Sequence, residues 1–155
     1  MTIPVTIRIQ QDDFDIAREI AALTGGRTDI GAVVTFTGIC RGGEGGEAIA
    51  ALTLEHYPDM AEAEIARHAE TAMSRWPVSA LTIIHRIGRI LPGENIVLVV
   101  TASVHREAAF AAAEFLMDYL KAHAPFWKRA EAAAGAAWVE AREQDDAAAD
   151  RWTKS

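Results

Sequence analysis

A helix that must end at a proline constrains this chain more than any other stretch. Residues 106–123 have the pattern of an amphipathic helix, with apolar side chains at three- and four-residue spacing: Phe110, Ala113, Met117 and Leu120. Pro125 ends this helix, because proline lacks an N–H and disfavours helical geometry in the residue before it. Phe126 and Trp127 can anchor the chain after the break. The chain is therefore expected to change direction at Pro125.

The same stretch gathers positive charge. The whole chain has only three lysines, and Lys121 and Lys128 both lie within residues 117–129. Lys121 lies one turn beyond Met117, so its methylenes can cover apolar surface while its ammonium points into a cleft. The break after the helix would bring Lys128 and Arg129 back toward Lys121. The alternative is an ordinary helix C-terminus with cations that suit the helix dipole.

Length and charge limit the classes of protein. The 155 residues, half of them hydrophobic, fit one domain over residues 1–155. A net charge of −7 argues against a surface for nucleic acid or anionic membrane, which needs a broad basic face. Without a leader or an apolar run of ~20 residues, a cytoplasmic protein is expected. The single cysteine, Cys40, argues against a disulfide framework and a cysteine-rich zinc site, so we expect no metal and no cofactor.

The pattern of elements predicts an α+β domain. Strands are predicted over residues 2–9, 31–38, 48–57, 78–87 and 94–104, and helices from Asp12 or Asp13 to about Leu23, from Pro58 to about Arg75, and over 106–123. The last two strands would form a hairpin around Pro92 and Gly93. Four glycines in residues 42–46 predict a mobile loop over 42–47. A tail is expected over residues 143–155. The rest of the chain should fold as helices packed against a largely antiparallel sheet.

Cationic side chains form a dispersed set in this acidic chain: Arg41, His105, Arg106, Lys121, Lys128 and Arg129. Of two His-Arg pairs, 85–86 and 105–106, the second is the better functional candidate, because it lies where a strand meets a helix and backbone N–H groups can also bind an anion. The set suggests a pocket for a phosphorylated or carboxylated small molecule, with a lysine as acid, base or covalent amine. Cys40 could be a nucleophile or simply a small apolar residue.

The chain resembles the catalytic large subunit family of molybdopterin synthase in six blocks of sequence: GAVVTFTG with Arg41, LTLEHYPDM, HRIGRILPGE, SVHREAAF, MDYLKAHAPFWKR and WVEAR. The resemblance implies a hammerhead-like α/β fold and a sulfurtransferase of molybdenum cofactor biosynthesis. Cyclic pyranopterin monophosphate would receive two sulfurs and become the dithiolene of molybdopterin. The donor would be the C-terminal Gly-Gly thiocarboxylate of a small ubiquitin-like subunit, in a heterotetramer built on a homodimer of the large subunit.

The resemblance also implies roles for individual residues. Lys121 corresponds to the catalytic lysine of the family and Lys128 to its second active-site lysine. The residues that would bind the substrate are Ile39, Cys40, Arg41, His105, Arg106, Lys121, Lys128 and Arg129. The family often has a glutamate two residues after the second lysine, whereas this chain has Ala130 followed by Glu131. Arg142, in the WVEAR block, is a candidate for reaching the neighbouring subunit's pocket.

A thiocarboxylate sulfur already carries negative charge, so such an enzyme needs cations that bring two anions together rather than a cysteine or a metal. Cys40 then has no required part in the reaction. Two alternatives remain open. One is a non-catalytic α+β module that binds an anionic metabolite, and the other is a lysine enzyme that acts alone on a carbonyl compound through a Schiff base.

Overall fold

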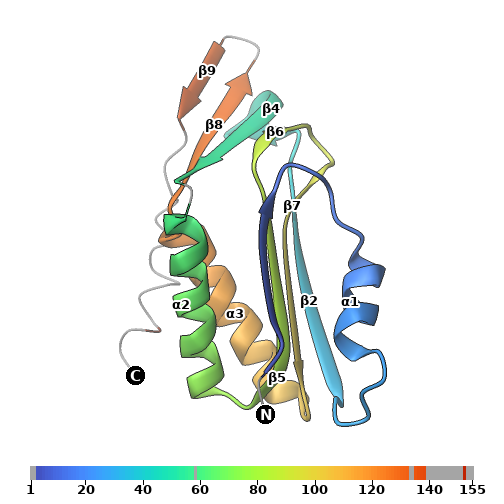
Figure 1. The fold of residues 1–155 in the computed structure, drawn as a ribbon. Coiled ribbons are helices and arrows are strands. Elements are labelled where there is room, and N and C mark those ends of the chain that lie inside the picture. Colours follow the sequence, from blue (N-terminus) through green and yellow to red (C-terminus); the bar gives the residue numbers. More distant parts are fainter. Residues whose placement is uncertain (1–2, 58, 133–134, 139–151, 153–155) are drawn as a thin grey trace.

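The computed structural model describes residues 3–57, 59–132, 135–138 and 152. Their three helices and nine strands confirm the predicted α+β class (Figure 1). The elements are β1 (Val5–Gln10), α1 (Ile16–Thr24), β2 (Ala32–Ile39), β3 (Gly43–Glu44), β4 (Glu47–His56), α2 (Met60–Arg75), β5 (Val78–Arg86), β6 (Gly88–Ile90), β7 (Asn95–Ser103), α3 (Arg106–Ala122), β8 (Phe126–Ala132) and β9 (Gly135–Trp138). No helix in the described ranges is long and apolar enough to cross a bilayer.

The larger core is built around a four-stranded sheet with the order β1-β5-β7-β2. β1 pairs with β5 in parallel, and the other pairs are antiparallel. Figure 1 shows α2 and α3 on one face of this sheet and α1 on the other. The two central strands, β5 and β7, are therefore buried on both faces, which explains why their sequences are apolar almost throughout rather than alternating.

A second sheet, of five mostly short strands, is attached at one end of the first. Its order is β3-β4-β8-β9, and β6 pairs with Leu52–Leu54 of β4. A separate small core lies under it, formed by Cys40, Ile49, Leu52, Leu54 and Ile90. The strand β8 follows Pro125 directly and has no clear alternation of apolar and polar residues, so sequence reasoning did not predict it. The hydrogen bonds to β4 stabilise β8 as a strand, although its composition alone does not favour one.

The structure corrects one predicted helix start and one predicted connection between strands. Helix α1 begins at Ile16 rather than near Asp12 or Asp13, because the side chain of Asp15 accepts a hydrogen bond from the backbone N–H of Arg18 at 3.1 Å and caps the helix. Strands β5 and β7 pair as predicted. However, they are not joined by a short turn, because β6 lies between them and pairs with β4.

The glycine-rich stretch forms a hairpin rather than an open loop. Gly43 pairs with Ala48 and Glu44 with Glu47, with Gly45 and Gly46 between them at φ of 62° and 86°. Positive φ at both central residues is the requirement of a tight hairpin turn, and glycine meets it without steric cost. Whether this hairpin moves stays a prediction, and Pro58 and all of the tail over 143–155 except Trp152 lie outside the described residues.

A close contact between backbones at the start of β2 gives a stability test. A Cβ on Gly31 would lie 2.2 Å from the carbonyl oxygen of Val104, whereas a Cβ on Gly42 would meet only the Pro92 Cβ at 3.9 Å. We expect Gly31→Ala to lower the free energy of unfolding by about 2 kcal/mol or more, as overpacking does. Gly42→Ala should change it by less than about 0.5 kcal/mol. Equal denaturant midpoints for the two variants would contradict this contact.

Candidate functional site

The two lysines reach the same end of the molecule on different elements. Lys121 lies in the last turn of α3, and the cap N–H of His123 donates to the carbonyl oxygen of Tyr119 at 2.8 Å. The chain then turns at Pro125 into β8, where Lys128 lies opposite Leu54 of β4. Lys121 is exposed and Lys128 is half-buried. The packing of α3 and the pairing of β8, rather than a flexible loop, therefore position both ammonium groups.

Lys128 lies on the side of β8 that faces the small core. Ala130, two residues further along the strand, packs against that core, and alternate residues of a strand share a face. Burial raises the pKa of the Cys40 thiol, the Glu94 carboxylate raises it further, and the positive charge of Lys128 opposes them. The structure thus places Lys128 close enough to Cys40, which precedes Arg41, for its charge to act on the thiol.

Cys40 has the environment of a structural residue. It is only 2% exposed. Its backbone N–H donates to the Glu94 carbonyl oxygen at 2.9 Å, and its own carbonyl oxygen accepts from the N–H of Gly93 at 2.7 Å. Because the thiol pKa is raised, the sulfur stays protonated near neutral pH and is a poor nucleophile. These bonds hold the end of β2, and so the start of the Arg41 segment, against the turn before β7.

Lys121 lies near a buried histidine, His85, at the end of β5. The His85 ring stacks on the ring of Phe126, with centroids 4.0 Å apart and planes 13° apart. Burial lowers the pKa of the His85 imidazole to about 4, and the charges of Lys121 and His56 act in the same direction. Sequence reasoning ranked this His-Arg pair below the junction pair, although its place at the end of a strand buried on both faces was a usable signal.

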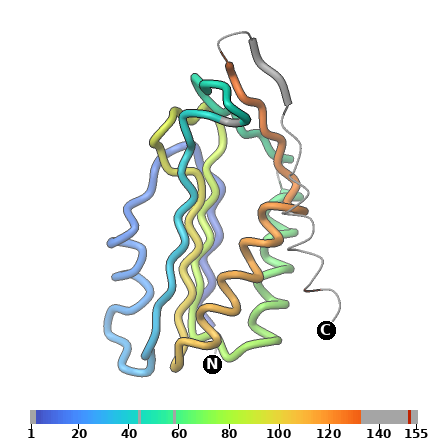
Figure 2. The backbone as a smooth tube through the Cα atoms, turned by 180° about the vertical axis from the view of Figure 1, so that it is seen from behind, coloured from blue at the N-terminus to red at the C-terminus, as the bar shows by residue number. Residues whose placement is uncertain are grey.

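The other His-Arg pair lies far from the lysines. β2 and β7 run antiparallel, so Ile39 lies opposite Asn95 at one end of the sheet and Ala32 lies opposite Ser103 at the other. His105 and Arg106 follow Ser103, and both are exposed. Along β7 the two ends are separated by roughly 25 Å, at about 3.4 Å per residue. Figures 1 and 2 show the start of α3 at the end of the first sheet remote from the second sheet.

One chain therefore does not unite the six predicted cations in one pocket. Arg41, Lys121 and Lys128 lie at the end of the sheet where the small core is attached, and the junction pair lies at the other end. Arg129 follows Lys128 on β8, so its side chain starts from the opposite face of that strand. Arg142 lies outside the described residues.

Glu131 is held by an arginine of β6. Its carboxylate lies 3.3 Å from Nη2 of Arg89, and both side chains are partly exposed. On β8, Glu131 alternates with Ala130, which packs on the small core. Its carboxylate is therefore on the face away from Lys128, and it does not replace a glutamate at the position of Ala130.

A buried arginine ties together the strand ends beneath the site. Arg86 donates from Nε to the Gln11 carbonyl oxygen at 3.0 Å and from Nη1 to the Asn95 carbonyl oxygen at 2.8 Å. The Asn95 amide donates to Asp13 at 2.9 Å, and this bond lowers the pKa of the Asp13 carboxyl. This network joins the ends of β1, β5 and β7 beside Ile39.

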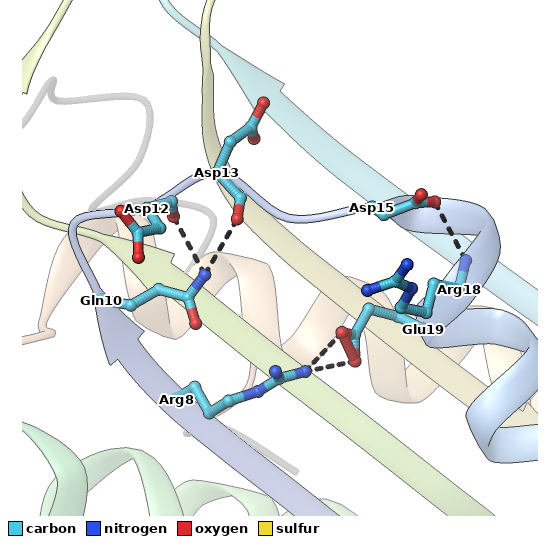
Figure 3. A network of polar contacts seen from close by, with 7 residues as sticks. All are labelled: Arg8, Gln10, Asp12, Asp13, Asp15, Arg18 and Glu19. Atoms are coloured by element: carbon cyan, nitrogen blue, oxygen red, sulfur yellow. Dashed lines mark hydrogen bonds and ion pairs between the residues drawn. The ribbon is translucent and has the colours of Figure 1, made fainter.

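The same β1 segment is tied to α1. Figure 3 shows the Gln10 amide donating to the carbonyl oxygens of Asp12 and Asp13 and the guanidinium of Arg8 paired with Glu19. Together these bonds hold the connection between β1 and α1, which gives the site end of the sheet a fixed shape.

Comparison with known proteins identifies relatives over nearly the whole chain. The family model described as "MoaE protein" matches residues 9–123. A protein of Mesorhizobium japonicum named molybdopterin synthase catalytic subunit is 62% identical, over 97% of this chain and 94% of its own length. The structure of the molybdopterin biosynthesis MoaE protein from Burkholderia ambifaria superposes with a TM-score of 0.82 at 47% identity, covering 97% of this chain and 99% of that one.

A more distant structure shares the fold. It is titled as a protein-protein complex of subunits 1 and 2 of molybdopterin-converting factor from Helicobacter pylori. It matches with a TM-score of 0.70 at 24% identity, over 89% of this chain and 91% of that chain.

The lowered pKa of His85 predicts a pH-dependent stability. Its folded-state pKa is about 4, against an ordinary value of 6.5, so below pH 6.5 the unfolded state binds a proton that the folded state does not. His85 should therefore cost about 3 kcal/mol of stability as the pH falls from 6.5 to 4. In His85→Phe this component should be absent. Urea unfolding of both proteins from pH 7 to 4 measures the difference, and parallel curves would refute it.

Proposed function

Because the chain belongs to the MoaE protein family, the family of molybdopterin synthase catalytic subunits, we propose that it transfers sulfur to a pterin precursor within a two-subunit synthase. The acceptor is cyclic pyranopterin monophosphate, and two sulfurs convert it to the dithiolene of molybdopterin. The donor is the thiocarboxylate at the C-terminal Gly-Gly of a small ubiquitin-like subunit. The Helicobacter pylori neighbour, a complex of two subunits, supports the compatibility of this fold with such an assembly.

The arrangement of Lys121 and Lys128 is the observation that carries this proposal. Two lysines, one on a helix and one on a strand, lie at one end of the sheet in a chain whose net charge is −7. A thiocarboxylate and a phosphorylated pterin are both anions, and cations at fixed positions lower the cost of bringing them together. Cys40, buried with a raised thiol pKa, is unsuited to carry the sulfur itself.

The substrate pocket is completed, in this proposal, by a second copy of the chain. The family resemblance assigns Arg41, His105 and Arg106 to one phosphate pocket, yet within one chain they lie at opposite ends of the sheet. A two-fold axis perpendicular to the strands removes this conflict, since it places one end of a protomer beside the opposite end of its partner. Arg41 of each chain would then share a pocket with the junction pair of the other.

The outer edge of β2 is the surface best suited to that contact. β2 is the last strand of the first sheet, and on it Phe36 is 38% and Ile39 is 53% exposed. Phe110 of α3, which packs over this sheet, is 60% exposed. Two β2 strands paired antiparallel about a two-fold axis would place Ile39 near Ala32 of the partner, and so near the start of the partner's α3.

A matched pair of substitutions tests the chemical roles. Lys121→Ala should abolish conversion of the precursor while leaving the melting temperature within a few degrees, because the side chain is exposed. Cys40→Ala should remain active, since the transferred sulfur belongs to the small subunit. Both are measured with purified chain, precursor and thiocarboxylated small subunit. Normal turnover by Lys121→Ala, or a folded but inactive Cys40→Ala, would refute the assignment.

Mixed dimers test the shared pocket. Arg41→Ala and Arg106→Ala should each weaken precursor binding at least about tenfold, since a charge-assisted bond contributes about 1.5–3 kcal/mol. If each pocket takes Arg41 from one chain and Arg106 from the other, a dimer of the two variants has one intact pocket and one doubly altered pocket. Such dimers, purified with two different tags, should bind precursor at one site per dimer with normal affinity. Two equally weakened sites would show that both arginines act within one chain.

A further inference from the structure

His85 has one ring nitrogen committed to the backbone and one left over. Nδ1 lies 2.8 Å from the carbonyl oxygen of Arg86. A carbonyl oxygen can only accept, so Nδ1 carries the ring proton in this contact and donates it. In the neutral ring Nε2 therefore presents a lone pair. The local backbone thus selects the tautomer in which Nε2 is a hydrogen-bond acceptor.

The orientation of the His85 ring is fixed by an aromatic stack. Phe126 lies face to face with it at 4.0 Å, and the ring of His56 lies 6.3 Å beyond Phe126. These three rings come from the ends of β5 and β4 and from the start of β8. Because Phe126 directly follows the proline that ends α3, the stack also fixes the imidazole relative to the helix end that carries Lys121.

His85 is only 7% exposed as a whole residue, and its Nε2 is the nitrogen that the backbone leaves unpaired. Within the described part of the chain, the Tyr119 hydroxyl is the sole side-chain polar atom that is both sealed from solvent and unpaired. Nε2 of His85 has no hydrogen-bond partner in that part of the chain either. The charge of Lys121 acts on this imidazole, which places the lysine on the same side of the molecule.

We propose that His85 is a positioning residue for Lys121, whose ammonium donates a hydrogen bond to a water that in turn donates to Nε2. The role in catalysis rests on the function proposed above for Lys121, but the contact itself does not. A neutral acceptor directs the ammonium without cancelling its positive charge, whereas a carboxylate would form an ion pair and weaken its attraction for an anionic substrate. In this contact the lysine keeps its proton, and no proton is transferred to the imidazole.

The charges around the ring favour this role. Lys121 of α3 and His56 of β4 both disfavour the imidazolium, and burial does so most strongly. The adjacent Arg86 has its guanidinium turned to the carbonyl oxygens of Gln11 and Asn95. The ring of His85 therefore remains neutral near pH 7, and its lone pair remains available to an ammonium group.

The contact can be tested without substrate. The rate at which Lys121 is acylated by a small amine-selective reagent at pH 7.5, followed by mass spectrometry, reports the fraction of free amine. In His85→Phe the stacked shape is kept but the acceptor is lost, so the Lys121 pKa should fall and its acylation should become about five- to tenfold faster. His85→Gln, whose amide oxygen can replace Nε2, should restore a rate near that of the unaltered chain. Lys128 is the internal control and should not change.

A measurement on the unaltered His85 tests the contact even if the His85 variants do not fold. Nitrogen NMR of the full chain should show the neutral ring with its proton on Nδ1 at pH 7, and Lys121→Met should shift the Nε2 resonance. In turnover, His85→Phe should lower kcat at least about tenfold with little change in KM, and His85→Gln should recover most of it. The contact would be overturned by an unchanged rate of Lys121 acylation in a folded His85→Phe variant. It would also be overturned if the Nε2 resonance did not shift in Lys121→Met. Normal kcat in His85→Phe would overturn its role in the reaction.

Discussion

The pairing of β5 with β7 determines where every other element can lie. Both strands are covered on both faces, by α1 on one side and by α2 and α3 on the other. Because β5 and β7 each use one edge to pair with the other, β1 and β2 join the sheet at the two edges that remain. Since β7 leads into α3 with only Val104 and His105 between them, the length of this strand pair also sets how far the start of α3 lies from the second sheet.

That distance has a chemical consequence. The cations of an acidic chain are divided between two ends of one sheet, so neither end alone holds the whole set that the family resemblance assigns to the substrate. The pocket proposed above, completed by a partner chain, would form only in the dimer and would link catalysis to assembly. The exposed apolar side chains along β2 and α3 are consistent with such a contact, because a monomer gains nothing by presenting them to water.

At the other end of α3, the break at Pro125 places Lys121 on the helix before it and Lys128 on the strand after it. Helix α3 ends, and β8 begins directly after Pro125. Phe126, the first residue of β8, stacks on the ring of His85. Lys121 and Lys128 are thereby held by a helix and by a strand, which are both packed against buried residues. Sites held in this way keep their geometry better than sites on loops, and a reaction between two anions depends on that geometry.

Local chemistry was readable from the sequence, and long-range placement was not. The 3.6-residue period before Pro125, the runs of β-branched residues and the spacing of MDYLKAHAPFWKR predicted the α+β class, α3 and its end, and the family. β8 was missed because its pattern is weak and its stability comes from pairing with β4, whose paired residues lie 70 or more positions earlier. His85 was ranked below His105 because a histidine within a strand gives no sequence signal of a functional role. The neighbouring Phe126 and Lys121 are brought close to it only by the tertiary structure. The separation of Arg41 from Arg106 was decided by tertiary structure alone, since the direction in which β2 runs along β7 depends on contacts between distant parts of the chain that no local pattern encodes.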